Sequence, residues 1–225
     1  MTQPLLIFDL DGTLAETAGD LMATLNHVLA SEGIAPVPTE RARYLVGAGA
    51  KALLMRGFAA QGQTLEGERL ERLYTAFLNH YDAHIADQTF LFPGVVAAMD
   101  RFEAAGWGLA VCTNKVERPA RKLLEALGVA HRFRAIVGQD TFGVAKPDPR
   151  ILEKTIQSAG GSPARAVMVG DSRADIETAR GLGVPVVAVD FGYTDTPVTE
   201  LGPDRVISHF DALWDAVQAV RAARV

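Results

Sequence analysis

The chain has 225 residues, and its 22 lysines and arginines against 27 aspartates and glutamates give a formal net charge of −5. Hydrophobic residues make up 48% and charged residues 22%, the balance of a globular protein and not of a disordered chain. The single cysteine excludes an internal disulfide and fits a reducing compartment. The acidic balance argues against nucleic acid as a partner.

Membrane and export signals are missing from the sequence pattern. No apolar run approaches the length of a membrane-spanning helix. The amino terminus lacks the basic leader and long apolar stretch of a signal peptide. We therefore expect a cytoplasmic protein with no membrane partner.

Short apolar runs that stop at polar residues recur along the chain and predict buried strands. The expected strands are residues 5–8, 109–112, 135–137, 166–169 and 184–189. Apolar residues with helical spacing lie between them. This alternation predicts an α/β fold with a Rossmann-like core, in which helices cover both faces of a parallel sheet.

Residues 16–87 interrupt this alternation. They contain no convincing strand, whereas Leu21, Leu25 and Val28 have helical spacing, as do Leu70 and Leu73 farther along. We expect a small helical cap at 16–87, inserted into a catalytic core formed by residues 1–15 and 88–225. An insertion at this point would lie above the carboxyl ends of the strands, where open α/β sheets bind ligands.

Four polar clusters lie near the ends of the expected strands. They are DLDGT from Asp9, TNK from Thr113, KPDP from Lys146 and GDSRAD from Gly170. Each has an ordinary structural explanation as a turn, a helix cap, a helix entry or a capping box. Together they would bring three carboxylates, a hydroxyl and a lysine to one edge of the sheet. A hard divalent cation would neutralise such a cluster, and oxygen ligands favour Mg²⁺ over zinc.

These four motifs, in this order, resemble those of the haloacid dehalogenase-like phosphatase superfamily, and the match spans the whole chain. The segment VGAGAK at residues 46–51 resembles the cap loop of the phosphoglycolate phosphatase branch. Members often carry asparagine where Ala48 stands and an Asp-Ser pair where Glu16-Thr17 stands. The resemblance implies a Mg²⁺-dependent phosphatase of a small phosphorylated metabolite, with 2-phosphoglycolate as the expected substrate.

The resemblance also implies roles for the carboxylates. Asp9 would be the nucleophile that forms an aspartyl-phosphate, and Asp11 would be the general acid and base. Mg²⁺ would be held by Asp9, the backbone carbonyl of Asp11 and Asp171. Asp175 would orient this group without binding the metal, unless it serves only to cap its helix.

The same resemblance places other residues around the phosphate. Thr113 and Lys146 would hold the phosphoryl oxygens, and Lys146 would neutralise the charge that develops there. Asn114 and Lys115 would line the site. Each would otherwise be an ordinary cap or surface residue.

The expected cap carries a local excess of positive charge. Between residues 34 and 65, a single acid faces four basic residues, which are Arg41, Arg43, Lys51 and Arg56. This excess beside Gly47 and Gly49 suits a substrate with a second anionic group, such as a carboxylate. We expect Lys51, Gly47 and Gly49 to contact substrate, against the alternative that the charges lie on solvated helix faces.

Several other functions compete with this hypothesis. Cys112 and Arg118 have the spacing of cysteine-dependent phosphatases, but the loop between them has no glycine. His80 and His84 share a helix face yet lack the glutamate of a zincin. A dehalogenase would not need Asp11 as an acid. A phosphatase of sugar phosphates or other small monophosphates, a β-phosphoglucomutase-like phosphomutase and a phosphate-binding regulatory protein remain alternatives, and the sequence does not decide between monomer and homodimer.

Overall fold

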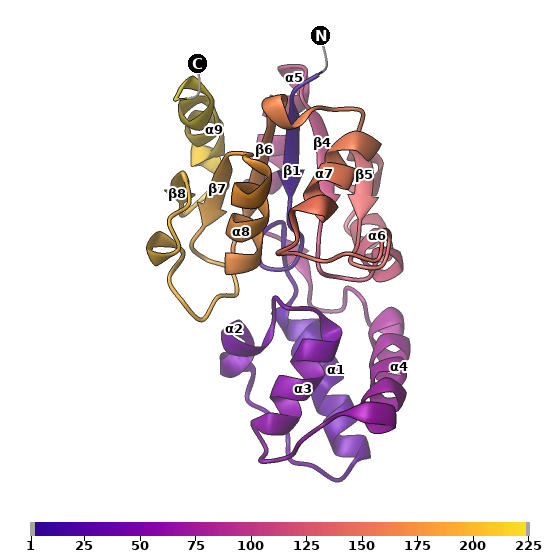
Figure 1. Ribbon diagram of the computed structural model, residues 1–225. Coiled ribbons are helices and arrows are strands. Elements are labelled where there is room, and N and C mark those ends of the chain that lie inside the picture. Colours follow the sequence, from indigo (N-terminus) through magenta and orange to yellow (C-terminus); the bar gives the residue numbers. More distant parts are fainter. Residues whose placement is uncertain (1–2, 224–225) are drawn as a thin grey trace.

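The computed structural model describes residues 3–223, and a six-stranded parallel sheet lies at its centre (Figure 1). In spatial order the strands are β5 (Phe133–Val137), β4 (Gly108–Cys112), β1 (Leu5–Phe8), β6 (Ala166–Gly170), β7 (Val186–Val189) and β8 (Arg205–Ile207). The expected α/β fold class is confirmed, and all five expected strands are present. Because β1 lies between β4 and β6, the residues that follow these three strands meet at one edge of the sheet.

Successive side chains of β1 point to opposite faces of the sheet, and helices cover both faces. Leu5 and Ile7 belong to a buried cluster with the helices α7 (Pro149–Ser158) and α8 (Arg173–Leu182). Leu6 and Phe8 point to the opposite face, which is covered by α5 (Val95–Ala104), α6 (Glu117–Ala126) and α9 (Leu213–Ala222). All four side chains of β1 are fully buried, as expected for the central strand of a sheet covered on both sides.

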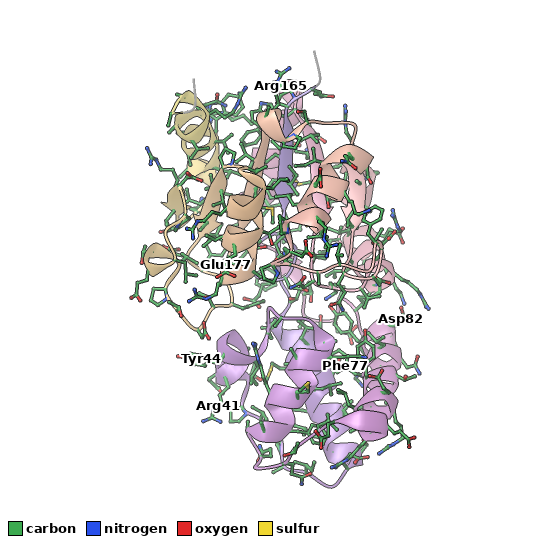
Figure 2. The ribbon with its side chains drawn as sticks, viewed as in Figure 1. Arg41, Tyr44, Phe77, Asp82, Arg165 and Glu177 are labelled. Atoms are coloured by element: carbon green, nitrogen blue, oxygen red, sulfur yellow. The ribbon has the colours of Figure 1, made fainter. Side chains whose placement is uncertain are left out.

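Four helices of residues 18–83 lie apart from the sheet, beyond the carboxyl ends of its strands (Figure 1). They are α1 (Ala18–Ser31), α2 (Ala42–Leu45), α3 (Ala50–Ala59) and α4 (Gly67–Ala83). Along α4, Leu73, Phe77 and Tyr81 recur every fourth residue, and all three are buried. Figure 2 shows Phe77 turned in among these helices, whereas Arg41 and Tyr44 lie on their outer side. The cap therefore has an apolar interior of its own.

The chain enters and leaves the cap through two adjoining short strands. β2 (Ala15–Glu16) pairs antiparallel with β3 (Phe90–Leu91). The buried carboxylate of Asp20 binds the segment just before β3. It accepts hydrogen bonds from the backbone amides of Gln88 and Thr89 and from the Thr89 hydroxyl at 2.7 Å. The pair lies beside the expected domain boundaries, although the sequence pattern indicated no strand there.

The remaining helical segments are short 3₁₀ helices at Thr39–Arg41, Ala130–Arg132, Pro163–Arg165, Val198–Glu200 and Phe210–Ala212. Among residues 3–223, none of the helices combines the length and apolar character needed to cross a lipid bilayer.

Candidate active site

Asp9, the first residue after β1, lies at the centre of a buried charge cluster. Its carboxylate is 2.8 Å from the ammonium group of Lys146, which comes from the loop between β5 and α7. The same ammonium group lies 2.6 Å from the carboxylate of Asp175 on α8. Burial opposes the charge on Lys146, but the carboxylates of Asp175 and Asp9 outweigh it and raise the pKa of the lysine. Lys146 is therefore a fixed positive charge beside Asp9.

Asp171 follows β6 and completes the carboxylate cluster. It accepts hydrogen bonds from the Thr13 hydroxyl at 2.8 Å and the Tyr193 amide at 2.6 Å. Burial and the charge of Asp9 raise the pKa of Asp171, and burial likewise raises the pKa of Asp9 to about 6. Gly12 has a φ of +83°, and a Cβ atom there would lie 2.7 Å from an Asp171 oxygen. Glycine therefore lets the first loop close over this carboxylate.

The arrangement fits a hard divalent cation. Asp9, Asp171 and Asp175 each offer a carboxylate oxygen within 4.8 Å of the others. Three buried carboxylates surround one buried ammonium group, so negative charge is in excess, and every donor atom is oxygen. Both oxygens of Asp175 already have partners, one the ammonium group of Lys146 and the other the backbone amide and hydroxyl of Ser172. Each oxygen of Asp171 accepts only one hydrogen bond from an uncharged donor, and neither contacts the lysine, so Asp9 and Asp171 are the better-placed ligands.

Asp175 both caps its helix and binds Lys146, so the structural and the functional explanation of this residue are both correct. With Ser172 it forms the capping box that starts α8, as the spacing of the two residues indicated. Its other carboxylate oxygen holds Lys146, a contact that the spacing alone does not reveal. Capping thus fixes the carboxylate in the position from which it orients the lysine.

Thr113 and Asn114 follow β4, and neither caps the next helix, because the residue before α6 is Val116. The hydroxyl of Thr113 is buried and accepts a hydrogen bond from the Lys115 amide at 3.1 Å. The Asn114 side chain pairs with the backbone of Lys146, donating to its carbonyl at 3.1 Å and accepting from its amide at 2.9 Å. Asn114 thus holds the loop that carries Lys146.

Lys115 joins the first two motifs to the cap. Its ammonium group lies 2.9 Å and 3.2 Å from the two carboxylate oxygens of Asp11, and 4.5 Å from the centre of the Tyr81 ring. Burial disfavours its charge, but Asp11 and Tyr81 outweigh that effect and raise the pKa of Lys115. The lysine is therefore charged while almost fully enclosed.

A pocket with a volume of about 40 Å³ lies between the carboxylates and the cap. The core contributes Asp9, Asp11, Thr113, Asn114 and Lys115. The cap side of the lining includes Leu21, Val46, Gly47, Gly49, Ala50, Leu53, Phe77, Leu78 and Tyr81. The cap thus covers the charged site with a mostly apolar surface.

The structure separates the expected cap contacts into two groups. Gly47 and Gly49 line the pocket, and at Gly49, where φ is +86°, a Cβ atom would lie 3.1 Å from the Asn114 carbonyl oxygen. Lys51 does not line this pocket. Its side chain is 45% exposed and pairs with Glu71 at 2.6 Å, so local helix contacts satisfy its charge.

Arg56 and Arg41 are also placed away from this pocket. Arg56 donates to the Leu45 carbonyl and lines a separate cleft that also contains Lys146 and Tyr193. Arg41 is exposed. The side chain of Arg43 lies outside the described part of the structure. The local charge excess is thus spread over several faces of the cap.

The competing sites lack the required environments. Cys112 is fully buried, and burial raises the pKa of its thiol to about 11, so it is not a thiolate. Arg118 is exposed and pairs with Asp82. His80 and His84 stack at 4.5 Å, and within residues 3–223 only the aspartate cluster brings three candidate metal ligands together.

Three residues near the site were outside the predicted set. Thr13 lies within the first motif, but its contact with Asp171 depends on how that loop turns. Tyr193 binds Asp171 through its amide, while its hydroxyl accepts from the amides of Thr17 and Ala18 and donates to Glu16. Tyr81 has the spacing of a core residue on α4. Sequence spacing gives no sign that it lines the pocket.

Comparison with known proteins agrees with this geometry. The profile of the haloacid dehalogenase-like hydrolase family matches residues 6–189. The phosphoglycolate phosphatase of Mesorhizobium japonicum is 51% identical over 225 residues, which cover 99% of either chain. That of Agrobacterium fabrum is 47% identical, with 95% of this chain and 92% of the relative covered.

A solved structure has the same fold. The crystal structure of a predicted phosphoglycolate phosphatase from Haemophilus somnus superposes with a TM-score of 0.89 at 26% identity, covering 96% of this chain and 99% of its own. The chain therefore belongs to the haloacid dehalogenase-like hydrolase family. Within that family it is a phosphatase, and it is similar over nearly its full length to phosphoglycolate phosphatases.

Proposed function

We propose that the chain hydrolyses 2-phosphoglycolate to glycolate and phosphate through an aspartyl-phosphate on Asp9, with Mg²⁺ as cofactor. The observation that carries the mechanism is the fixed placement of Asp9 beside Lys146, with Asp11 on the same loop as Asp9 and Asp171 on the loop after β6. The identity of the substrate rests on the names of the full-length relatives. A carboxylate on the substrate also suits a pocket lined by the cation Lys115.

In the first half of the reaction, an oxygen of Asp9 attacks phosphorus and the bond from phosphorus to the glycolate oxygen breaks. Asp11 gives a proton to the departing oxygen. Lys146 and the Thr113 hydroxyl hold the phosphoryl oxygens. Bound Mg²⁺, held by Asp9, Asp171 and the Asp11 carbonyl, would supply positive charge that offsets repulsion between the carboxylate and the phosphate.

In the second half, water attacks phosphorus and the bond to the Asp9 oxygen breaks. Asp11 takes the proton from that water, which returns both aspartates to their starting states. Asp175 and Asn114 act only through Lys146, by holding its ammonium group and its backbone. Removal of the Asp175 carboxylate or the Asn114 amide would misplace the lysine and would not remove a reacting atom.

We also propose that the cap opens to admit substrate, because cap residues cover Asp9 and Asp11 on the side of the pocket away from the sheet. Closing the cap again would exclude bulk water from the intermediate. The partner is a small molecule and neither nucleic acid nor a membrane, and the protein acts in the cytoplasm. The enclosed pocket and the acidic net charge support this proposal.

Phosphate release from a panel of substrates tests the proposal. The panel contains 2-phosphoglycolate, hexose phosphates, nucleoside monophosphates and pyrophosphate, each with Mg²⁺ and with a chelator. We expect 2-phosphoglycolate to give the highest kcat/KM, chelation to stop turnover, and Asp9→Asn to lower kcat by at least roughly 10³-fold.

Other outcomes lead to other functions. A different preferred substrate with the same metal and Asp9 dependence would keep the mechanism and replace the substrate. Transfer of the phosphoryl group between positions of a sugar would indicate a phosphomutase. Tight phosphate binding without turnover of any compound would indicate a regulatory binding protein.

A further inference from the structure

The hydroxyl of Tyr81 is a buried donor without an acceptor. Tyr81 lies on the cap helix α4, is 2% exposed and lines the pocket that contains Asp9 and Asp11. The charged group beside this hydroxyl is the Lys115 ammonium group, which can only donate. Within residues 3–223 the hydroxyl proton therefore has no acceptor. Buried polar groups are nearly always paired, because leaving one unpaired costs stability. A hydroxyl proton without an acceptor beside a binding pocket indicates an acceptor that arrives with the ligand.

The chemistry of this hydroxyl is that of a donor. Burial raises the pKa of Tyr81, so the phenol keeps its proton. Lys115 adds a second donor group, since its ammonium group lies 4.5 Å from the centre of the Tyr81 ring. Lys115 is also the single cation among the described residues that line this pocket. Two donors, one of them charged, select an anionic acceptor.

The position of Asp11 shows which part of the substrate would reach these donors. Asp11 must lie close to the departing oxygen in order to protonate it, and Lys115 binds both oxygens of Asp11. The leaving group therefore extends from Asp11 toward Lys115 and Tyr81. The phosphoryl group lies on the other side, between Asp9 and Lys146.

We propose that the Tyr81 hydroxyl and the Lys115 ammonium group form the subsite that binds a carboxylate on the leaving group. This inference rests on the proposed function and assigns the residues that select its substrate. The surrounding side chains Leu21, Leu53 and Phe77 offer the rest of the leaving group no polar partner. A neutral alkyl group would leave the Tyr81 hydroxyl without an acceptor, whereas a carboxylate would accept from it and add a second anionic partner for Lys115, which already pairs with Asp11.

Glycolate serves as the probe of this subsite, because its binding does not depend on turnover. We would titrate glycolate and, separately, inorganic phosphate into the wild type, Tyr81→Phe and Tyr74→Phe with detection by NMR. Tyr74 is the matched control, because it is a tyrosine of the same helix that does not line this pocket. We expect Tyr81→Phe to raise the Kd of glycolate about tenfold while the Kd of phosphate changes less than twofold. Tyr74→Phe should alter neither value.

Turnover provides the second measurement, as the ratio of kcat/KM for 2-phosphoglycolate to that for ethyl phosphate. We expect this ratio to fall about tenfold in Tyr81→Phe, mainly through KM, and at least as far in Lys115→Met. Tyr81→Phe should melt no lower than the wild type, because the hydroxyl that it removes has no acceptor among residues 3–223.

Three results would overturn the proposal: unchanged glycolate affinity in Tyr81→Phe, an equal loss in Tyr74→Phe, or an equal loss on both substrates in Lys115→Met. The last would mean that Lys115 acts only through Asp11. The proposed function fails separately, if the wild type releases phosphate from no compound. In that case the glycolate titration still decides whether Tyr81 binds a carboxylate.

Discussion

The sheet edge and the cap both concentrate charged residues, but they arrange them differently. At the sheet edge the charges are buried and bind one another, as Lys146 does with Asp9 and Asp175. On the cap, Lys51 pairs with Glu71 in contact with solvent. The end of a parallel strand fixes where the next side chain lies, whereas each helical residue turns about 100° from the last. A group of charges therefore locates a site far better after a strand than along a helix.

The largest expected effect comes from removing the buried lysine. Lys146→Met leaves Asp9 and Asp175 without their positive partner, and breaking a buried pair in this way costs about 3–5 kcal/mol. We expect that loss in the free energy of unfolding measured with urea, and a fall in kcat of roughly 10²–10³-fold.

Lys154→Met is the matched control, because Lys154 is an exposed lysine that lies over the Phe142 ring. It should change the free energy of unfolding by less than about 0.5 kcal/mol. Equal effects of the two substitutions would contradict the contrast between buried and exposed charge.

A smaller effect is expected from metal binding, and it can be measured without substrate. At a Mg²⁺ concentration about 100 times its Kd, binding to the folded state adds about 2.7 kcal/mol, which raises the Tm by roughly 5–10 °C. Asp171→Asn should abolish most of this rise, because it removes a buried carboxylate from the cluster. A rise of the same size in the variant would show that the cation binds elsewhere.

The smallest effect is expected on the cap surface. Lys51→Met removes an exposed ion pair, which contributes about 0–1 kcal/mol to stability. Because Lys51 does not line the pocket, kcat/KM for 2-phosphoglycolate should stay within about twofold of the wild type. A loss of tenfold or more would show that the side chain reaches the substrate when the cap moves.

The arrangement of the sheet was predictable because its signals are local. Each central strand is a short apolar run that ends at a polar residue, so the positions of Asp9, Thr113 and Asp171 follow from the chain itself. β8 escaped prediction because it lies at the edge of the sheet and only Ile207 is fully buried. β2 and β3 have two residues each, too few to give a pattern.

The contacts of the site were less predictable, because they join residues distant in sequence. Thr13 and Asp171 are 158 positions apart, and Lys115 and Asp11 are 104 apart. Tyr81 shares its spacing with Leu73 and Phe77, which are core residues, and only the packing of the cap on the core brings it beside Lys115 in the lining of the pocket. Residue type and order indicated the chemistry, while the ion pairs required the fold.

The pairing of β2 with β3 has a consequence for how such a protein changes over time. The two ends of the cap segment are neighbours within the core, so the ends of any inserted segment are already brought together. A longer or differently folded insert can occupy the same place without moving β1 or β6. The cap residues that help to select the leaving group, such as Tyr81, therefore lie on a different segment from the residues that transfer the phosphoryl group, and a change in the cap can alter substrate preference while the reaction stays the same.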